Sequence, residues 1–328
     1  MSSEIRARFR IVTPMFLSGA DQKKVADTIR PPSIKGALRF WWRALHWETV
    51  LKTEGSVSDA LKQLHQMEAE LFGAAARKDR PSLGQAPFSI RVDYTHPGQN
   101  CSVTDWPKNN TGSGYLGFGL FETNKEPSHR VALRENGTFD LMVRFRKGVP
   151  DAKKEALQRT ISAFGLLGGL GSRGMRRGFG SVSLVELDGK SVVPAGSSAY
   201  FQSIQSLGSY SLDGHDFPLT AFSRETSIVP LARGNRARSV HSEMGNQYKQ
   251  YRGQEGKLRG KQKIPFGLPL AKVDEQNRRA SPLMFHVHAL QDELLGVVAC
   301  FPNQFHPKVT IPGYGVVTSF LDHYRLKA

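Results

Sequence analysis

The order in which the spacing of apolar residues changes along the first 190 residues constrains the fold of this chain most strongly. Four segments in which apolar and polar residues alternate are predicted to be strands: 4–12, 88–94, 139–145 and 181–187. Apolar residues at helical spacing predict helices from about Pro31, over about 57–72, and from Asp151 to about Leu167. Strand, helices, strand, strand, helix and strand form the βαββαβ order of a ferredoxin-like (RRM-like) domain.

Single residues predict the ends and the buried faces of the first two helices. Ser33 is a suitable N-cap for the first helix. The apolar stripe of that helix comprises Ile34, Leu38, Trp41 and Leu45. In the second helix we expect Leu61, Leu64 and Leu71 to face inward, and Gly73 suits its C-terminal end.

Beyond residue 190 the patterns are weaker. Strands are predicted at Leu283–His288 and Gly296–Phe301, and a further strand is considered at Phe217–Phe222. Residues 224–279 are rich in Gly, Gln and Arg and are interpreted as a long inserted loop. The segment 316–326 suits either a strand or a helix.

The chain length supports a division into two domains. A chain of 328 residues exceeds the usual size of one domain, roughly 100–200 residues. We therefore predict an α+β protein of two ferredoxin-like domains with loop insertions. The expected domains are residues 1–190, with a glycine-rich loop, and residues 191–328, an incomplete or decorated domain with a long basic insertion at about 224–279.

The charge of the chain indicates a polyanionic partner. Lys and Arg number 45 against 29 Asp and Glu, so the formal net charge is +16. A sequence pI of about 10.0 favours nucleic acid as the partner, with an acidic membrane surface as the weaker alternative. An amphipathic basic helix with a lipid-type apolar face is not found in the sequence, so no membrane partner is expected.

The sequence also favours a cytoplasmic protein without a cofactor or a metal. No run approaches the roughly 18 apolar residues of a transmembrane helix, and the N-terminal residues carry no signal-peptide core. Cys101 and Cys300 lie far apart and form no CxxC motif, which argues against both a zinc site and a disulfide framework. A reducing cytoplasm is the simplest setting.

The first candidate RNA-binding group lies at the start of the first helix: Arg30, Ser33, Lys35, Arg39 and Arg43. The two arginines of the helix and Lys35 recur every four residues, so they line one side of it. A helix start also offers free backbone N–H groups to a phosphate. The alternative is an ordinary solvated charged face, but no acidic residue interrupts the sequence between Arg30 and Trp47.

The second candidate is the glycine-rich loop between the third predicted helix and the following strand. Its proposed RNA-binding residues are Gly169, Gly171, Arg173, Arg176, Arg177 and Phe179. Glycines let the backbone approach a ligand, guanidinium groups pair with phosphate oxygens, and a phenylalanine can stack on a base. The loop follows a helix, so it is neither a Walker loop nor a dinucleotide fingerprint. A flexible linker is the alternative, but three arginines without an acid argue against it.

The third candidate is the segment 224–279. It holds thirteen Lys or Arg and five Asp or Glu, a net charge of +8. The residues proposed to bind RNA are Arg233, Arg236, Arg238, Lys249 and Arg252. Tyr248 and Tyr251 are interleaved with the last two of these, in the mixture typical of a single-strand groove. We weigh a flexible arm that orders on RNA or on a neighbouring subunit nearly equally against a disordered soluble loop.

No motif in the sequence indicates catalysis. A metal-independent ribonuclease needs a base near the 2′-hydroxyl, and no histidine has a partner nearby in the sequence. His286 and His288 share one face of a predicted strand, where a structural role is favoured. A non-catalytic binding role is therefore preferred, and an endoribonuclease that processes RNA precursors with His46 or His96 as the base is the alternative.

Several of these segments resemble a known family. Residues Thr13–Asp21 and Arg30–Arg43 resemble the N-terminus of the first-numbered Cmr subunit family, which belongs to the RAMP superfamily of CRISPR type III-B effectors. Residues Gly168–Gly180 look like the glycine-rich loop of the superfamily. Residues Phe266–Pro269 and Arg278–Pro282 resemble a third element of the same family.

The resemblance implies two ferredoxin-like domains and a place near the head end of a helical ribonucleoprotein. It implies guide RNA, held at its 3′ region, and target RNA as ligands, other Cmr subunits as partners, and no small-molecule substrate. Target cleavage belongs to another subunit of such complexes. The matched residues implied as RNA contacts are Lys35, Arg39, Arg43, Arg173, Arg176 and Arg177. The roles of Asp21 and of residues 95–135 stay open.

Overall fold

The computed structural model describes residues 3–18, 28–75, 84–95, 102–103, 105–121, 130–311 and 313–326. Within these ranges the protein is a mixed α+β structure whose strands pair antiparallel. None of the described helices is long and apolar enough to span a bilayer.

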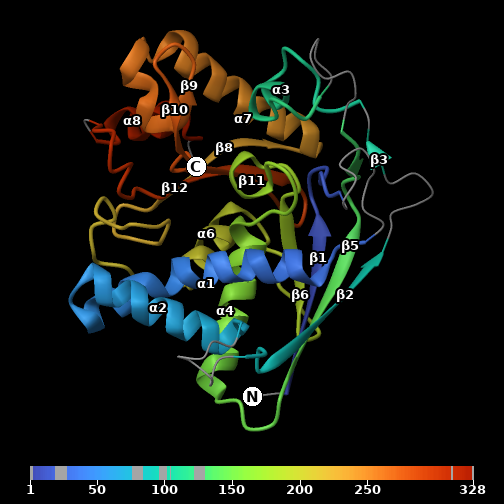
Figure 1. Cartoon of the computed structure of the whole chain (residues 1–328). Coiled ribbons are helices and arrows are strands. Elements are labelled where there is room, and N and C mark those ends of the chain that lie inside the picture. The colour runs from blue at the N-terminus through green and yellow to red at the C-terminus, as the bar shows by residue number, and fades with distance from the viewer. Residues whose placement is uncertain are drawn as a thin grey trace.

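Five strands form the larger sheet, in the spatial order β2-β5-β1-β6-β7 (Figure 1). Their bounds are β1 (Glu4–Ile11), β2 (Phe88–Thr95), β5 (Thr138–Phe145), β6 (Val182–Leu187) and β7 (Lys190–Ser191). The register pairs Ile5 with Val143 and Phe9 with Phe139, so apolar side chains of β1 and β5 gather on one face. The four strands predicted from alternation are thus confirmed with nearly the expected bounds.

Helices cover the apolar face of this sheet. They are α1 (Pro31–Glu54), α2 (Val57–Phe72) and α4 (Asp151–Leu167). The first and third of these pack against each other and α4 contacts the sheet, while α2 lies against the outer side of α1 (Figure 1). The predicted apolar stripe of α1 is buried, from Ile34 to Leu45.

Two details of these helices differ from the prediction. Ser33 is not the N-cap of α1, because the helix already begins at Pro31 and Arg30 occupies the cap position without a side-chain cap bond. A proline suits the first helical position because its missing N–H would have no partner there. Leu61 is 40% exposed, whereas Leu64 and Leu71 are buried, since Leu61 lies on the outer side of α2.

The second half of the chain contains a smaller sheet, in the order β11-β12-β8. Its strands are β8 (Ser227–Gly234), β11 (Leu283–Ala289) and β12 (Leu294–Cys300), with the helices α6 (Ser197–Gln205), α7 (Ala237–Gln250) and α8 (Gly315–Tyr324). The last two predicted strands are confirmed, and the C-terminal segment is helical. The segment 217–222 forms no strand.

The interpretation of residues 224–279 as a long flexible loop was wrong. This segment forms β8, α7, a π-helical turn (Tyr251–Glu255), a 3-10 helix (Gly260–Phe266) and the hairpin of β9 (Leu268–Leu270) and β10 (Asp274–Arg279). Val240, Met244 and Tyr248 recur at helical spacing on the buried side of α7. The overall composition of the segment does not reveal this stripe, because many polar residues lie on the other side of α7.

The insertion between β2 and β5 contains β3 (Ser102–Val103), α3 (Gly112–Leu116) and β4 (Ala132–Leu133). Helix α3 packs on α7, so this part of the first half contacts the second half (Figure 1). The contact is very close, because a Cβ atom at Gly112 would lie 1.9 Å from the carbonyl oxygen of Ser242. The insertion is therefore part of the boundary between the two halves.

The two halves also share one apolar core. A single cluster of buried residues includes Phe9 and Phe164 from the first half and Tyr200, Val297 and Phe301 from the second. The hydroxyl of Tyr200 donates a 2.8 Å hydrogen bond to the carbonyl oxygen of Leu166. The boundary expected at residue 190 therefore separates two segments that share one core, and the division into domains stays a prediction.

Candidate nucleic-acid interface

A cleft of about 850 Å³ lies where the glycine-rich loop, the insertion and the second half of the chain meet. We call it the arginine cleft, because five arginines line it: Arg173, Arg176, Arg177, Arg252 and Arg279. Its other walls come from the end of α3, the end of α7 and the segments 266–271 and 279–281. No carboxylate is among the described residues that line it. Such a cleft presents a concentrated positive charge to a ligand.

The backbone of the glycine-rich loop brings its arginines to the cleft. Gly171 has a φ of +83°, and a Cβ atom there would lie 2.6 Å from the carbonyl oxygen of Phe16. Ser172 N–H donates to that same carbonyl at 2.9 Å, which fixes the loop against the segment after β1. Arg173 then adopts a left-handed conformation with φ 63°, before the short helix α5 (Gly174–Arg177). The loop is thus a rigid turn rather than a linker.

Arg176 links the glycine-rich loop to the second half of the chain. It donates to the carbonyl oxygen of Ser281 at 2.6 Å and to the hydroxyl of Thr220 at 3.1 Å. Burial, together with the nearby charges of Arg279 and Arg177, lowers its pKa from 12.5 to about 10. Arg176 therefore joins the loop to the second half of the chain, and its charge contributes to the field of the cleft.

Arg177 and Arg252 lie against the ring of the buried Tyr248, with guanidinium carbons 5.4 and 5.2 Å from the ring centroid. Burial opposes ionisation of this phenol, but the two cations outweigh it and lower the pKa of Tyr248. The Nη1 atom of Arg177 is buried and has no hydrogen-bond partner. This atom is closed off from the surface, so it is the charge of Arg177 that acts on a ligand in the cleft.

The buried imidazole of His241 fixes the backbone of the glycine-rich loop. His241 Nε2 lies 2.7 Å from the carbonyl oxygen of Arg177, and its Nδ1 lies 2.8 Å from the hydroxyl of Ser113. A carbonyl only accepts, so Nε2 carries the proton and Nδ1 accepts from the serine. Burial lowers the pKa of His241 to about 4, in keeping with a neutral ring. One side chain of α7 thus connects α3 to the loop.

Sequence reasoning missed three contributors to the arginine cleft. Tyr115 accepts a 2.7 Å hydrogen bond from Arg252, and Phe118 accepts a 2.7 Å bond at its carbonyl oxygen from Arg173. Arg279 comes from the end of β10. A signal for it existed, because the resemblance covered both Phe266–Pro269 and Arg278–Pro282 and both segments line the cleft.

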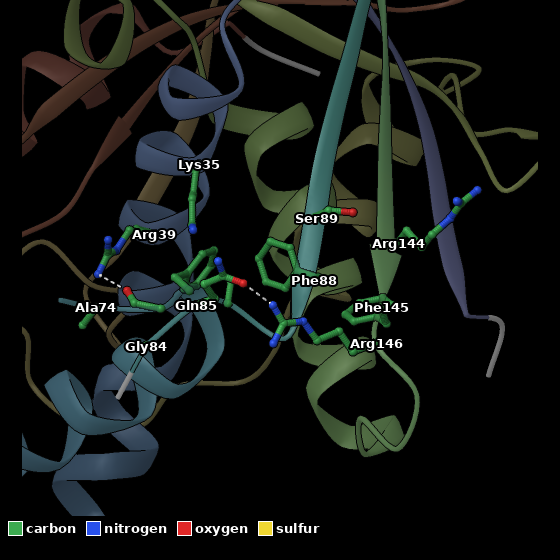
Figure 2. A pocket seen from close by; sticks show the side chains of 13 residues that line it. Lys35, Arg39, Ala74, Gly84, Gln85, Phe88, Ser89, Arg144, Phe145 and Arg146 are labelled. Atoms are coloured by element: carbon green, nitrogen blue, oxygen red, sulfur yellow. Dashed lines mark hydrogen bonds between the residues drawn. The ribbon is translucent and has the colours of Figure 1, made fainter. Parts of the chain in front are cut away.

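A second cleft of about 620 Å³ lies between the start of α1, the end of α2 and the edge strand β2. We call it the lysine cleft; Lys35 and Arg39 line it from α1, and the Nζ atom of Lys35 lies 5.9 Å from the ring centroid of Phe88 (Figure 2). Burial and the charge of Arg39 lower the pKa of Lys35. Arg146 also lines this cleft and donates to the side chain of Gln85.

An acid from α2 offsets part of this charge. The buried carboxylate of Glu68 accepts a 2.5 Å bond from Arg39 and a 2.8 Å bond from Arg43. The absence of acids within the segment 30–47 therefore did not exclude a paired face, because the acid lies on the neighbouring helix. Arg43 does not line the lysine cleft, and neither do Arg30 or Ser33.

The structure does not place the two groups of cations in one cleft. Lys35 and Arg39 line the lysine cleft, Arg173 and Arg177 line the arginine cleft, and the two clefts share no lining residue. The loop arginines and Arg252, proposed as RNA contacts from separate segments, lie together in the arginine cleft.

The remaining predicted site residues lie elsewhere. Arg233 and Arg236 line a separate shallow hollow of about 460 Å³ together with Glu243. Arg238 pairs with Glu135 at 2.7 Å, and Lys249 is exposed outside both clefts.

Several aromatic and glycine residues have structural roles. Phe179 is fully buried against Trp106 and His241, so its predicted stacking on a base was wrong. The proposed groove of Tyr248 and Tyr251 was also wrong, since both rings are buried. Gly169 packs against the backbone of Gly174 and does not line either cleft. Phe179 was misjudged because burial here depends on the insertion, which is distant in sequence.

The open face of the larger sheet is a network of ion pairs. Arg8 pairs with Asp140 at 2.7 Å, and Arg144 pairs with Glu4 at 2.7 Å. RRM proteins bind RNA through aromatic side chains on this face. Alternation along β1, β2 and β5 places no aromatic side chain there among the described residues. The clefts, not this face, are therefore the candidate interface.

His46, the candidate catalytic histidine within the described residues, lines neither cleft. His46 stacks on Trp42 and hydrogen-bonds to its carbonyl oxygen, and burial lowers the pKa of His46 to about 4. His286 and His288 share a face as expected. Both are buried, and Nε2 of His286 lies 3.3 Å from Nδ1 of His288. Asp21 and His96 lie outside the described residues.

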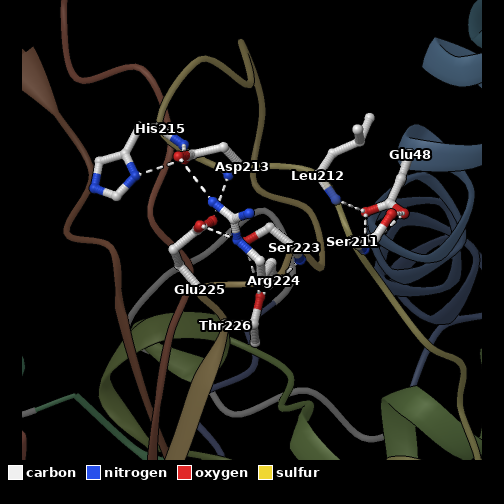
Figure 3. A network of polar contacts seen from close by, with 10 residues as sticks. Glu48, Ser211, Leu212, Asp213, His215, Ser223, Arg224, Glu225 and Thr226 are labelled. Carbon is white, nitrogen blue, oxygen red and sulfur yellow. Dashed lines mark hydrogen bonds and ion pairs between the residues drawn. The ribbon is translucent and has the colours of Figure 1, made fainter.

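One group of side chains has the composition of a metal site. The potential ligand atoms of Asp213, His215 and Glu225 lie within 4.8 Å of one another. Arg224 already pairs with both carboxylates, at 3.5 Å and 3.0 Å, and Glu225 also accepts from a backbone N–H (Figure 3). We interpret this network as structural: its ion pairs and hydrogen bonds stabilise the conformation of the segment 211–226.

The first residues of the same segment are hydrogen-bonded to α1. The buried carboxylate of Glu48 accepts from the backbone N–H groups of Ser211, at 2.9 and 3.0 Å, and Leu212, at 3.0 Å (Figure 3). Lys52 completes the arrangement with a 2.6 Å ion pair to Glu48. These bonds hold the connection between the two halves of the chain to the first helix.

Comparison with known proteins gives consistent matches. A sequence model of the RAMP superfamily matches residues 8–183. The CRISPR system Cmr subunit Cmr1-1 of Pyrococcus furiosus is 25% identical over 318 residues, covering 89% of this chain and 87% of that protein.

Solved structures extend the match to the fold of nearly the whole chain. The crystal structure of Cmr1 from Pyrococcus furiosus in its apo form has a TM-score of 0.61 at 20% identity, covering 98% of this chain and 97% of that one. A chain in a cryo-EM structure of the type III-B Cmr-beta bound to cognate target RNA has a TM-score of 0.55 at 12% identity, covering 97% and 98%.

Proposed function

The chain belongs to the RAMP superfamily, and from this premise we propose that it is an RNA-binding subunit of a cytoplasmic CRISPR type III-B (Cmr) ribonucleoprotein in antiviral defence. Its proposed ligands are the 3′ region of the guide RNA and the target RNA, and its proposed partners are other Cmr subunits. The relative from Pyrococcus furiosus is named as a Cmr subunit. A solved complex with a chain of similar fold is described as bound to cognate target RNA.

The arginine cleft is the observation that supports RNA binding most strongly. Five guanidinium groups line it without a carboxylate among its described lining residues. RNA phosphates offer the oxygens that such donors need. The contacts proposed are to the backbone, so sequence would be read by pairing between guide and target.

The lysine cleft is proposed as a second backbone contact. Lys35, Arg39, Arg144 and Arg146 line it, and Glu68 and Glu4 offset part of this charge by pairing with Arg39 and Arg144. We propose that one RNA strand reaches both the arginine cleft and this cleft. The weaker net charge predicts a smaller share of the affinity.

We also propose that each sheet belongs to a ferredoxin-like unit. In the larger sheet the order β2-β5-β1-β6 is that expected for the four strands of a βαββαβ chain. The smaller unit has β8, α7, β11, β12 and α8 in the same sequence, without a complete last strand. Leu326 N–H donates to the carbonyl oxygen of Pro230 at 2.9 Å, at the edge of β8 where such a strand would pair.

Binding without cleavage is the favoured activity. Neither cleft has a histidine, aspartate or glutamate among its described lining residues, and general base catalysis at a 2′-hydroxyl needs such a group within reach. Incubation of the protein with precursor RNA and target RNA, with and without metal, should leave both intact. Site-specific cleavage that disappears in His46→Ala would establish the alternative endoribonuclease.

The binding site is tested by the salt dependence of RNA affinity. Arg252→Gln should weaken binding of a labelled single-stranded RNA to a similar degree for all sequences. The slope of log affinity against log salt should fall by about 0.7 unit per lost phosphate contact. Lys249→Gln removes an exposed cation three residues away and is the matched control. Equal effects of the two substitutions would contradict a specific role for the arginine cleft.

A further inference from the structure

The ring of Phe118 is the most exposed large apolar side chain among the described residues. It is 71% exposed, whereas the other large apolar residues with notable exposure, Val57, Leu61 and Val192, reach 38–40%. Phe118 lines the arginine cleft. An exposed aromatic ring beside a ligand cleft calls for an explanation, because a ring of this size normally gains free energy from burial.

The backbone around Phe118 keeps the ring outside the core. A Cβ atom at Gly117 would lie 2.6 Å from the ring of Phe179, so the backbone at this point is packed directly against the core. Gly119 has a φ of +89°, a conformation that side chains rarely adopt. Arg173 holds the carbonyl oxygen of Phe118 at 2.7 Å. The two glycines and the arginine therefore form a fixed turn that exposes the phenylalanine.

The surroundings of the ring suit an unpaired nucleobase. Arg173 contacts the backbone of Phe118 directly, and Arg177 and Arg252 line the same cleft. Single-stranded RNA combines phosphates, which pair with guanidinium groups, with bases whose faces stack on aromatic rings. Bases inside a duplex are already stacked and cannot cover such a ring. A protein partner would be expected to use a broader apolar patch than one isolated ring.

We propose that Phe118 stacks on an unpaired base of an RNA strand whose backbone lies in the arginine cleft. This inference rests on the proposed function and extends it, because it makes the cleft specific for single-stranded over double-stranded RNA. Phe118 supplies a contact to a base, whereas the arginines contact phosphates. The stacking is tolerant of sequence, since every base offers a flat face.

The test compares three substitutions in the full-length protein. Phe118→Ala removes the ring, Phe118→Leu keeps an apolar group without an aromatic face, and Phe118→Trp keeps stacking. Leu61→Ala, at an exposed position on α2 outside both clefts, is the control. Affinity for a labelled single-stranded RNA is measured by fluorescence anisotropy, and stacking by the quenching of 2-aminopurine placed along the same RNA.

We expect Phe118→Ala and Phe118→Leu to weaken binding by about five- to hundredfold. Phe118→Trp and Leu61→Ala should bind like the unchanged protein. The salt slope should stay the same in all four, since no phosphate contact is lost. Quenching at one 2-aminopurine position should be lost in Phe118→Leu, and duplex RNA should bind weakly with or without the ring.

Other results would overturn the inference. If Phe118→Ala binds single-stranded RNA normally while Arg252→Gln does not, the arginine cleft binds RNA but the ring has no part in it. If Phe118→Leu binds as well as the unchanged protein, the ring acts by bulk and not by stacking. If RNA binding is intact in Phe118→Ala but assembly with other subunits fails, the ring is a protein contact.

Discussion

The Nε2 atom of His241 lies 2.7 Å from the carbonyl oxygen of Arg177, so a buried side chain of α7 fixes the backbone of the glycine-rich loop. His241 also accepts a hydrogen bond from Ser113, on the insertion. The position of an arginine in the cleft therefore depends on two segments that are far from it in sequence.

The burial of His241 predicts a loss of stability in mild acid. The pKa of His241 is about 4 in the folded protein against an ordinary value of 6.5, so the unfolded chain binds more protons between these values. The free energy of unfolding should be fully present above about pH 6.5 and fall as the pH is lowered toward 4. This one group accounts for about 3 kcal/mol over that range.

Urea unfolding at several pH values measures this effect. His46 and His286 also have lowered pKa values, about 4 and about 3, and add to the slope of stability against pH. In His241→Gln the slope should be smaller by about 1.4 kcal/mol per pH unit, one proton's worth. An unchanged slope would mean that His241 is not neutral and buried in solution.

Arg176→Ala is expected to destabilise the fold. The substitution leaves the carbonyl oxygen of Ser281 without the donor that Arg176 supplies, and the hydroxyl of Thr220 keeps only a 3.4 Å bond from Asn303. Unsatisfied buried groups of this kind cost about 1–3 kcal/mol. Chemical denaturation gives the change in the free energy of unfolding, with Lys249→Ala as the control. Full stability combined with a large loss of RNA affinity would instead make Arg176 a direct contact.

Lys35→Gln tests the lysine cleft independently of the arginine cleft. If a phosphate lies there, the slope of log RNA affinity against log salt should fall by about 0.7 unit. Lys62→Gln removes an exposed lysine of α2 that lines neither cleft and should leave the slope unchanged. An unchanged slope in Lys35→Gln would restrict RNA to the arginine cleft.

Local patterns in the sequence were enough to predict much of this fold. Alternation along β1, β2, β5 and β6 and the stripe from Ile34 to Leu45 appear because each sheet face or helix face is buried on one side only. The grouping of Arg173, Arg176 and Arg177 followed from their closeness in the chain.

Features that depend on contacts between distant segments could not be predicted. Glu68 neutralises Arg39 from another helix, and the burial of Phe179 depends on Trp106 of the insertion. Phe118 and Arg279 reach the arginine cleft only because α3 packs on α7 and the β9–β10 hairpin lines the same cleft as the glycine-rich loop. Spacing along one segment contains no information about such neighbours.

Photocross-linking of RNA tests the central claim most directly. The full-length protein is irradiated with single-stranded RNA that carries 4-thiouridine, and cross-linked peptides are identified by mass spectrometry. Binding in the arginine cleft predicts cross-links in the segments 112–121 and 266–281, both of which line it. Cross-links confined to the open sheet face, in the segments 4–10 and 89–95, would contradict it.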